Sequence, residues 1–249
     1  MRLWVLTTLM ALTAGMALSP ARAVAEASPS AERCAIFRQG PLQHDRLATY
    51  AGRPTNDARE TRWLDLWYRP DYDFGGPSGG PDGLPNRSLL VDINLPDGQP
   101  LPKAYRNSAN PMTKSFFTVL LSGGAGDRAI ERIVYSVTSA PLAWEWPRPR
   151  TWVKTGETIG PYTRVEVEGA ADWAKAERDV YVQTVGDEVI SVMNCDKPGT
   201  ELNPSCQVYE KAAQWEINIL GFRRNQLDQL DRIRQLSQDF AACLTLPPG

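Results

Sequence analysis

Histidine is almost missing from this sequence, which contains one, His44, among 249 residues. A zinc site built on two histidines is therefore excluded, and a serine–histidine–acid triad could use only His44. The polar neighbours of His44 favour an exposed or capping histidine. The chain also lacks C-x-x-C, G-x-G-x-x-G and Gly-Lys-Ser/Thr. These absences predict a non-enzymatic protein without a cofactor or a metal ion.

A surplus of basic residues is missing as well. The chain has 27 Lys and Arg against 29 Asp and Glu, for a formal net charge of −2. Nucleic-acid-binding domains usually have a basic footprint, and surface-bound membrane proteins often have a polybasic patch. We therefore expect neither nucleic acid nor a membrane surface to be the partner.

Long apolar runs are confined to the N-terminus. Residues 3–18 are apolar, follow Arg2 and precede a small-x-small site that ends at Ala23. This order is typical of a secretory signal peptide, residues 1–23, although a second small-x-small site ends at Ala27. No cysteine directly follows the apolar run, so we expect no lipid anchor. Residues 24–249 are expected to form a soluble periplasmic protein without a membrane anchor.

Cysteine is scarce but even in number. Four cysteines allow three disulfide pairings, and an oxidising compartment favours disulfides over free thiols. Cys195 with Cys206 is the first choice, because both lie at the mouth of one loop between adjacent predicted strands. Cys34 would then pair with Cys243 and join the N-terminal region to the end of the last predicted helix.

The last quarter of the chain organises the predicted fold. Trp215, Ile217 and Ile219 alternate with polar residues, as expected of a strand with one buried face. From Asn225, which we expect to cap a helix, apolar residues recur at every third or fourth position instead. The predicted strands are 179–185, 188–194, 207–211 and 214–222, and the helical stripe is Leu227, Leu230, Ile233, Leu236, Phe240 and Leu244.

Upstream segments add further strands. Predicted strands cover 61–68, 88–94, 115–121, 128–139 and 162–167, and 170–178 is expected to be a short helix or loop. In 128–139 we expect Ile133, Tyr135 and Val137 on one face. The whole predicts an α+β fold: one domain over 24–249, mainly antiparallel sheet, stapled by disulfides, with the C-terminal amphipathic helix packed on the sheet. A domain boundary is weakly marked at 156–160.

Two groups of residues are candidates for binding. Asp71, Asp73 and Asp82 lie in a long loop rich in Gly and Pro. Their spacing resembles a calcium loop weakly, but Gly75 lacks a side-chain oxygen and Asp82 is shorter than the usual Glu, so we favour a solvated turn. The second group is an aromatic cluster: Trp144, Trp146 and Trp152. Such rings either form a binding surface or fill the edge of a core.

The last third of the chain resembles a known family. The motif is Val189-Ile-Ser-Val-Met-Asn-Cys195-Asp-Lys-Pro198-Gly199, then Asn203-Pro204-Ser-Cys206, Phe222-Arg-Arg224 and the helix after Leu227. It resembles a largely uncharacterised family of exported proteobacterial proteins, many of them lipoproteins, although this chain lacks a lipobox. Some members are found beside antibacterial type VI secretion effectors. The resemblance implies an immunity protein with a disulfide-pinned sheet and a terminal helix.

Three functions follow as hypotheses. The first is a periplasmic immunity protein, in which the acidic loop meets a basic effector and the tryptophans act as anchors. The second is an envelope protein that binds peptidoglycan or another glycan. The third is a glycan hydrolase that uses two carboxylates, for which the candidates are Asp65, Asp71, Asp73 and Glu145.

Overall fold

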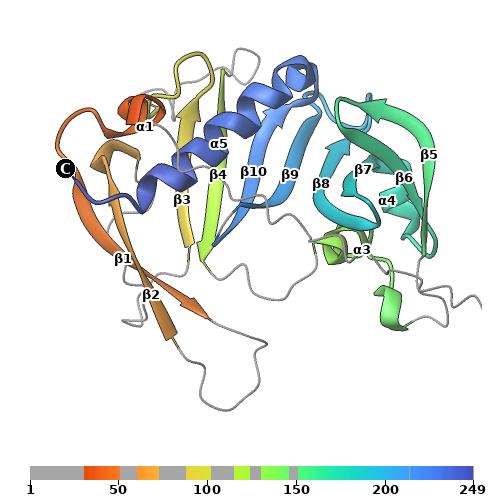
Figure 1. Ribbon diagram of the computed structural model, residues 1–249. Helices are drawn as coiled ribbons and strands as arrows, with labels where there is room; N and C mark the ends of the chain where they lie inside the picture. The colour runs from red at the N-terminus through yellow and green to blue at the C-terminus, as the bar shows by residue number, and fades with distance from the viewer. Residues whose placement is uncertain are drawn as a thin grey trace, which may run out of the picture.

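A computed structural model describes residues 31–50, 61–72, 88–101, 115–123, 130–145, 151–212 and 214–248. Its centre is an eight-stranded antiparallel sheet with the order β3-β4-β10-β9-β8-β7-β6-β5 (Figure 1). The strands are β3 (Ser88–Asn94), β4 (Phe116–Gly123), β5 (Trp152–Ile159), β6 (Tyr162–Val167), β7 (Arg178–Val185), β8 (Glu188–Asp196), β9 (Ser205–Ala212) and β10 (Trp215–Arg223). The predicted α+β class and the predicted strands of the last quarter are confirmed.

One face of the sheet is covered by the C-terminal helix α5 (Leu230–Leu244), which crosses β3, β4 and β10 in Figure 1. Leu230, Ile233, Leu236, Phe240 and Leu244 of the predicted stripe are buried in the main core. The expected cap at Asn225 is wrong. A 3-10 turn, η4 (Arg224–Gln229), precedes α5, and the Gln226 side chain accepts the Arg223 backbone N–H at 2.7 Å.

A short helix, α3 (Glu131–Thr138), packs on the opposite face against β6, β7 and β8. The predicted strand over 128–139 is therefore wrong. Val134, Tyr135 and Thr138 are the buried residues of this helix. Tyr135 and Thr138 follow Val134 by one and four positions, which is helical spacing, whereas a strand would bury every second residue. The error has a physical reason, because a short run of β-branched and aromatic residues fits either a strand or a helix until its neighbours are known.

Both predicted disulfides are confirmed. Cys195 and Cys206 lie opposite each other on β8 and β9, with their Cα atoms 4.1 Å apart. Cys34, on the helix α1 (Ala31–Arg38), is bonded to Cys243 near the end of α5. Phe37 of α1 packs edge-on against Phe240, with ring centroids 5.4 Å apart, so the bond joins two segments that already share a core.

A separate two-stranded ribbon, β1 (Gln43–Tyr50) and β2 (Thr61–Tyr68), extends from the β3 end of the molecule (Figure 1). Leu47, Leu66 and Tyr68 face the main core and are buried. The sequence analysis predicted β2 but not β1, and it also missed β5. Alternation is absent in β5 because residues 153–158 are all exposed at the sheet edge.

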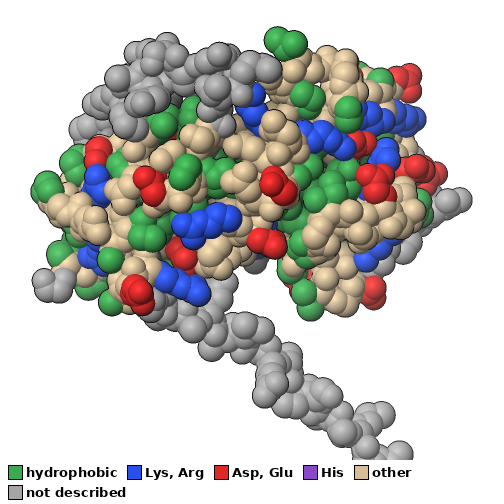
Figure 2. All heavy atoms as spheres, turned by 90° about the horizontal axis from the view of Figure 1, so that it is seen from above, with side chains coloured by type: hydrophobic (Ala, Val, Ile, Leu, Met, Phe, Trp, Pro, Cys, Tyr) green, Lys and Arg blue, Asp and Glu red, His purple; other side chains and the backbone are tan. Residues whose placement is uncertain are grey.

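The remaining described elements are η1 (Pro70–Tyr72), η3 (Ala143–Glu145) and α4 (Asp172–Glu177), the last in the segment predicted as a short helix or loop. Residues 156–160, where a boundary was weakly marked, belong to β5 and its turn into β6, so the single-domain prediction stays a prediction. Acidic and basic side chains are intermixed on the face seen in Figure 2. In the part of the chain that is described, no helix is long and apolar enough to cross a membrane.

Candidate functional site

A pocket of about 640 Å³ lies between α3 and the uncovered part of the sheet. This volume is within the range of ligand-binding pockets. One wall comes from α3 and the segment that follows it, and the floor comes from β4, β9 and β10. The lining residues used below are Arg132, Ile133, Ser136 and Leu142 on the wall, with Tyr209, Glu216 and Asn218 on the floor.

The helical geometry of α3 places its residues on two sides. Val134 and Thr138, one turn apart, point to the core, and the Thr138 hydroxyl donates to the Val134 carbonyl at 2.8 Å. Arg132 and Ser136, also one turn apart, line the pocket. The helix ends at Ser139, which has a left-handed φ of 50°. The chain then turns back, and the Ala140 N–H donates to the Tyr135 carbonyl at 2.9 Å.

Trp144 does not line this pocket, but it contacts Arg132, which does. Its side chain is 59% exposed, and the Arg132 guanidinium carbon is 4.4 Å from the centroid of its ring. This distance fits a cation–π contact. Because Arg132 also lines the pocket, the exposed Trp144 ring is one contact away from it. Of the three predicted tryptophan anchors, Trp144 is the one that the described structure places at an exposed site.

The floor of the pocket is polar and comes from the sheet. Tyr209 and Asn218 lie opposite each other on β9 and β10, and the Tyr209 hydroxyl donates to Gln207 at 2.7 Å. Burial raises the pKa of Tyr209, so its phenol stays protonated at neutral pH. The Asn218 amide lies against the Tyr209 hydroxyl and lowers its pKa in smaller measure, while the buried Asn218 Oδ1 has no hydrogen bond within the described residues. An unpaired acceptor in a pocket favours a ligand that carries a donor.

The other predicted anchors lie elsewhere. Trp152 is only 7% exposed, and its Nε1 donates to Glu131 at 2.8 Å, so this ring fills the core under α3. Asp71 is exposed and paired with Arg69, whose Nε donates to it at 3.1 Å. Asp73, Asp82 and Trp146 lie outside the described residues.

The hydrolase candidates are not all brought together. Asp71 is in η1, which packs on β3, whereas Glu145 follows α3, which packs on β6 to β8. Three strands, β4, β10 and β9, separate these parts of the sheet, so Glu145 cannot form a close pair with Asp71. Asp65, on β2, belongs to the ribbon at the β3 end (Figure 1).

Two other kinds of catalytic site would be a nucleophile elbow and a metal centre. A G-x-S-x-G match, Gly76-Pro-Ser-Gly-Gly80, lies after β2, outside the described residues. A nucleophile elbow would need a strand before this serine and a helix after it. Within the described ranges, no group of three or more His, Cys, Asp and Glu residues could hold a metal ion.

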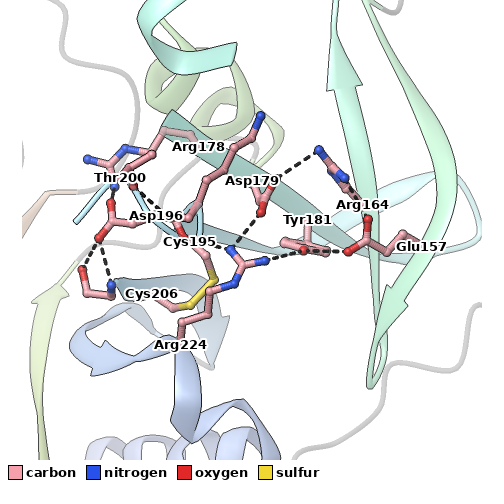
Figure 3. A network of polar contacts seen from close by, with 12 residues as sticks. Glu157, Arg164, Arg178, Asp179, Tyr181, Cys195, Asp196, Thr200, Cys206 and Arg224 are labelled. Carbon is pink, nitrogen blue, oxygen red and sulfur yellow. Dashed lines mark hydrogen bonds and ion pairs between the residues drawn. A yellow bond between two sulfur atoms is a disulfide. The ribbon is translucent and has the colours of Figure 1, made fainter. Parts of the chain in front are cut away.

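A network of arginines and carboxylates lies beside the Cys195–Cys206 disulfide (Figure 3). Arg224 contacts Asp179 at 2.8 Å and donates to the Asp196 carbonyl at 2.8 Å. Arg164 connects Asp179, at 3.0 Å, to Glu157, at 2.8 Å. Each charge has an opposite partner, so we assign this network to the stability of the sheet and η4 rather than to ligand binding.

Most of the pocket could not be predicted from the sequence. Arg132, Tyr209 and Asn218 were not candidates, because their proximity depends on α3 being a helix and on β4 pairing with β10. A signal for the helix was present in the spacing of Val134 and Thr138, but it is too short to decide between the two structures.

Comparisons with known proteins give one match. No protein-family model matches the chain, and no curated protein sequence is similar to it. Among solved structures, the iron-regulated outer membrane lipoprotein FrpD of Neisseria meningitidis is similar over 79% of this chain and 92% of its own, with 9% identity and a TM-score of 0.40. A similarity at this level establishes neither a shared fold nor a shared function. These comparisons reveal no link to immunity proteins.

Proposed function

We propose that this is an exported, non-enzymatic binding protein whose partner is another protein, bound at the pocket beside α3. The observation that carries the proposal is the exposed Trp144 ring held against Arg132, a residue that lines this pocket. Trp and Arg are the residue types most enriched among interface hot spots. Two buried disulfides support an oxidising compartment, where such bonds persist.

The chemistry of the pocket defines the side chains that would enter it. Ile133 and Leu142 offer apolar contacts, and Asn218 offers a buried acceptor. Arg132 places a positive charge at the opening. A partner loop that inserts an apolar or amide side chain and sets a carboxylate beside Arg132 would match all three features.

The finer form of the proposal is an immunity protein that neutralises an antibacterial effector of the type VI secretion kind. Its support is the resemblance of the last third of the chain. In this form, the effector would supply the side chains that enter the pocket.

The test combines toxicity and mutation. Each neighbouring open reading frame is expressed with a periplasmic signal in a sensitive bacterium, alone and with this protein, and growth is followed. We expect one neighbour to be toxic and the wild-type protein to rescue growth. Trp144→Ala and Ser136→Trp, which fills the pocket, should lose rescue. Trp173→Ala is the matched control, because Trp173 is an exposed tryptophan on α4.

The outcomes separate the parts of the proposal. A set of neighbours without toxicity contradicts the effector form. Rescue that persists in Trp144→Ala and Ser136→Trp contradicts the pocket as the contact site. Loss of rescue in all variants, Trp173→Ala included, points to a general loss of the protein, which immunoblots of the periplasmic fraction would show.

A further inference from the structure

The outer face of the β1–β2 ribbon carries five side chains that are aromatic or polar, which we call the ribbon face: His44, Arg46, Trp63, Asp65 and Trp67. His44 lies opposite Trp67, and Arg46 lies opposite Asp65. Side chains alternate along a strand, so these five share one side of the ribbon. Trp63 is 42% exposed, and the His44, Arg46 and Asp65 side chains are each about half exposed.

The fold does not require this face. The other side of the ribbon buries Leu47, Leu66 and Tyr68 in the main core, which is sufficient to anchor the two strands. A strand surface that served only as a solvated outer face would carry polar residues. Trp63 is exposed and Trp67 is partly buried, so this surface leaves some apolar area in water, which is unfavourable.

Both rings are held in place by side chains from β1. The Arg46 guanidinium carbon is 4.9 Å from the Trp63 ring centroid, and the His44 ring is 5.1 Å from the Trp67 ring at a 30° tilt. Asp65 connects His44 with Arg46, because its Oδ1 lies 2.9 Å from His44 Nε2 and 3.7 Å from Arg46 Nε. Side chains that are already ordered lose less entropy when a ligand binds.

The spacing gives two aromatic platforms with a polar centre. Trp63 and Trp67 are four residues apart on one strand face, which is about 13 Å at the usual rise of a strand. This span exceeds one sugar ring. The C–H faces of pyranose rings pack on indole rings, and the hydroxyl and amide groups at their edges need hydrogen-bond partners. Asp65 can accept from an amide N–H, and Arg46 can donate to a carbonyl.

A protein partner fits this face less well. The cores of protein interfaces are depleted of charged residues, because each charge must be desolvated on binding. The centre of the ribbon face holds the Arg46–Asp65 ion pair with His44 beside it, and the tryptophan rings lie at its ends. A glycan can hydrogen-bond to these three side chains while keeping much of its own hydration.

We propose that the ribbon face binds a glycan of N-acetylated amino sugars, with Trp63 and Trp67 as stacking platforms and Asp65 and Arg46 as the groups that bind the acetamido substituent. This inference is independent of the pocket beside α3. The pocket lies between β4 and α3, whereas the ribbon is outside the eight-stranded sheet. The two sites can therefore be tested one by one.

Two probes test the proposal with the purified mature protein: bacterial peptidoglycan sacculi in a co-sedimentation assay and a soluble N-acetylglucosamine oligosaccharide in a calorimetric titration. We expect the wild-type protein to bind both. Trp63→Ala should weaken binding of the oligosaccharide roughly tenfold or more, as removal of a hot-spot ring does. Asp65→Ala should weaken it as well, and Trp63→Phe should retain most of it.

Trp173→Ala is the matched control and should bind as the wild-type protein does. Thermal melting of every variant separates a loss of binding from a loss of folding, and Trp63→Phe provides the second test should Trp63→Ala unfold. The proposal is overturned by a wild-type protein that binds neither probe, by unchanged binding in Trp63→Ala, or by binding to sacculi that moderate salt abolishes. The ribbon face would be assigned to a protein partner instead if the wild-type protein bound neither sacculi nor the oligosaccharide and Trp63→Ala no longer rescued growth from the toxic neighbour.

Discussion

Arg234 of α5 contacts Glu210 of β9 with two nitrogen atoms, Nε and Nη2, each 2.8 Å from the same carboxylate oxygen. Glu210 is only 2% exposed, and its second oxygen accepts a hydrogen bond from Gln238 at 3.0 Å. The Arg234 guanidinium also lies over the ring of Tyr162, 5.3 Å from its centroid. This buried carboxylate therefore connects the C-terminal helix to the centre of the sheet.

Replacement of Glu210 by Ala should destabilise the fold strongly. The change leaves the charge of Arg234 partly buried without its partner, and breaking a buried ion pair from one side costs about 3–5 kcal/mol. Urea unfolding would measure this cost. Glu188→Ala is the control, because Glu188 is an exposed residue at the start of β8, and changes at such sites cost about 0.5 kcal/mol or less. Equal unfolding midpoints for the two variants would contradict a structural role for the pair.

Periodicity in the sequence predicts this connection in part. The stripe from Leu230 to Leu244 and the alternation around Ile217 identify the helix, the strand and the faces that they share. Glu210 gives no such signal, because a carboxylate in a strand is usually solvated. Its burial depends on the position of Arg234, which lies 24 residues further along the chain.

Long-range pairing explains what else the sequence could not predict. β4 pairs with β10, and this pairing joins β3 and β4 to the last quarter of the chain. The pocket lies where β4 and β10 meet α3. Because α3 was predicted as a strand, Arg132 was not predicted to line the pocket. The sequence left open whether Trp144 and Trp152 are exposed or buried. Trp144 is exposed, and Trp152 is buried beneath α3, where it donates a hydrogen bond to Glu131.

Acid should weaken the β5–β6 hairpin through Glu157. The hydrogen bond from Arg164, together with its charge and with Tyr181, lowers the pKa of Glu157 below its ordinary value of 4.5. A carboxyl group whose pKa is lower in the folded state stabilises the fold above its unfolded pKa, and this contribution is lost as the pH falls through the folded pKa. The contribution is present at neutral pH and should decline as the pH falls below 4.5 and through the lower folded pKa.

Glu157→Gln isolates this effect. Because the side chain is about half exposed, we expect a loss of less than about 1 kcal/mol at pH 7. The difference from the wild-type protein should shrink as the pH is lowered from 5 toward 3, measured as urea midpoints at each pH. A difference that stays constant over this range would show that the carboxylate charge has no role in the effect.

Gly98 should be sensitive to a single added methyl group. Its φ is +72°, and a Cβ there would lie 3.0 Å from Leu236 Cδ2 and 3.2 Å from Ile36 Cγ2. The Gly98 carbonyl also accepts the Tyr72 hydroxyl at 2.6 Å, which limits how far the turn can move. We expect Gly98→Ala to cost about 2–4 kcal/mol, from the left-handed backbone and the crowding together.

Gly160→Ala separates the two causes. Gly160 also has a positive φ, +53°, but a Cβ there would meet nothing within 4 Å. Its variant should show the backbone cost alone, about 1–2 kcal/mol. Should both variants lose the same stability in urea, the contacts with Leu236 and Ile36 contribute nothing.

The two disulfides should contribute unequally to stability. In the chain-entropy model, a cross-link stabilises the fold by restricting the unfolded chain, and its effect grows with the length of the closed loop. The Cys34–Cys243 bond joins residues 209 positions apart, and the Cys195–Cys206 bond joins residues 11 positions apart. The model gives about 5 kcal/mol for the long loop and about 3 kcal/mol for the short one.

Two double variants test this order: Cys34→Ala with Cys243→Ala, and Cys195→Ala with Cys206→Ala. All four sulfur-bearing residues are buried, so the loss of packing is similar in both variants and the difference reports mainly on the loops. In urea unfolding of the oxidised proteins, the variant without Cys34 and Cys243 should have a lower free energy of unfolding than the variant without Cys195 and Cys206. The reverse order would mean that native-state effects exceed loop entropy. The Cys195–Cys206 bond links directly opposed residues on β8 and β9. Beside it, Asp196 accepts a hydrogen bond from the Ser205 backbone N–H at 2.8 Å. Loss of the disulfide would then release the whole β8–β9 turn.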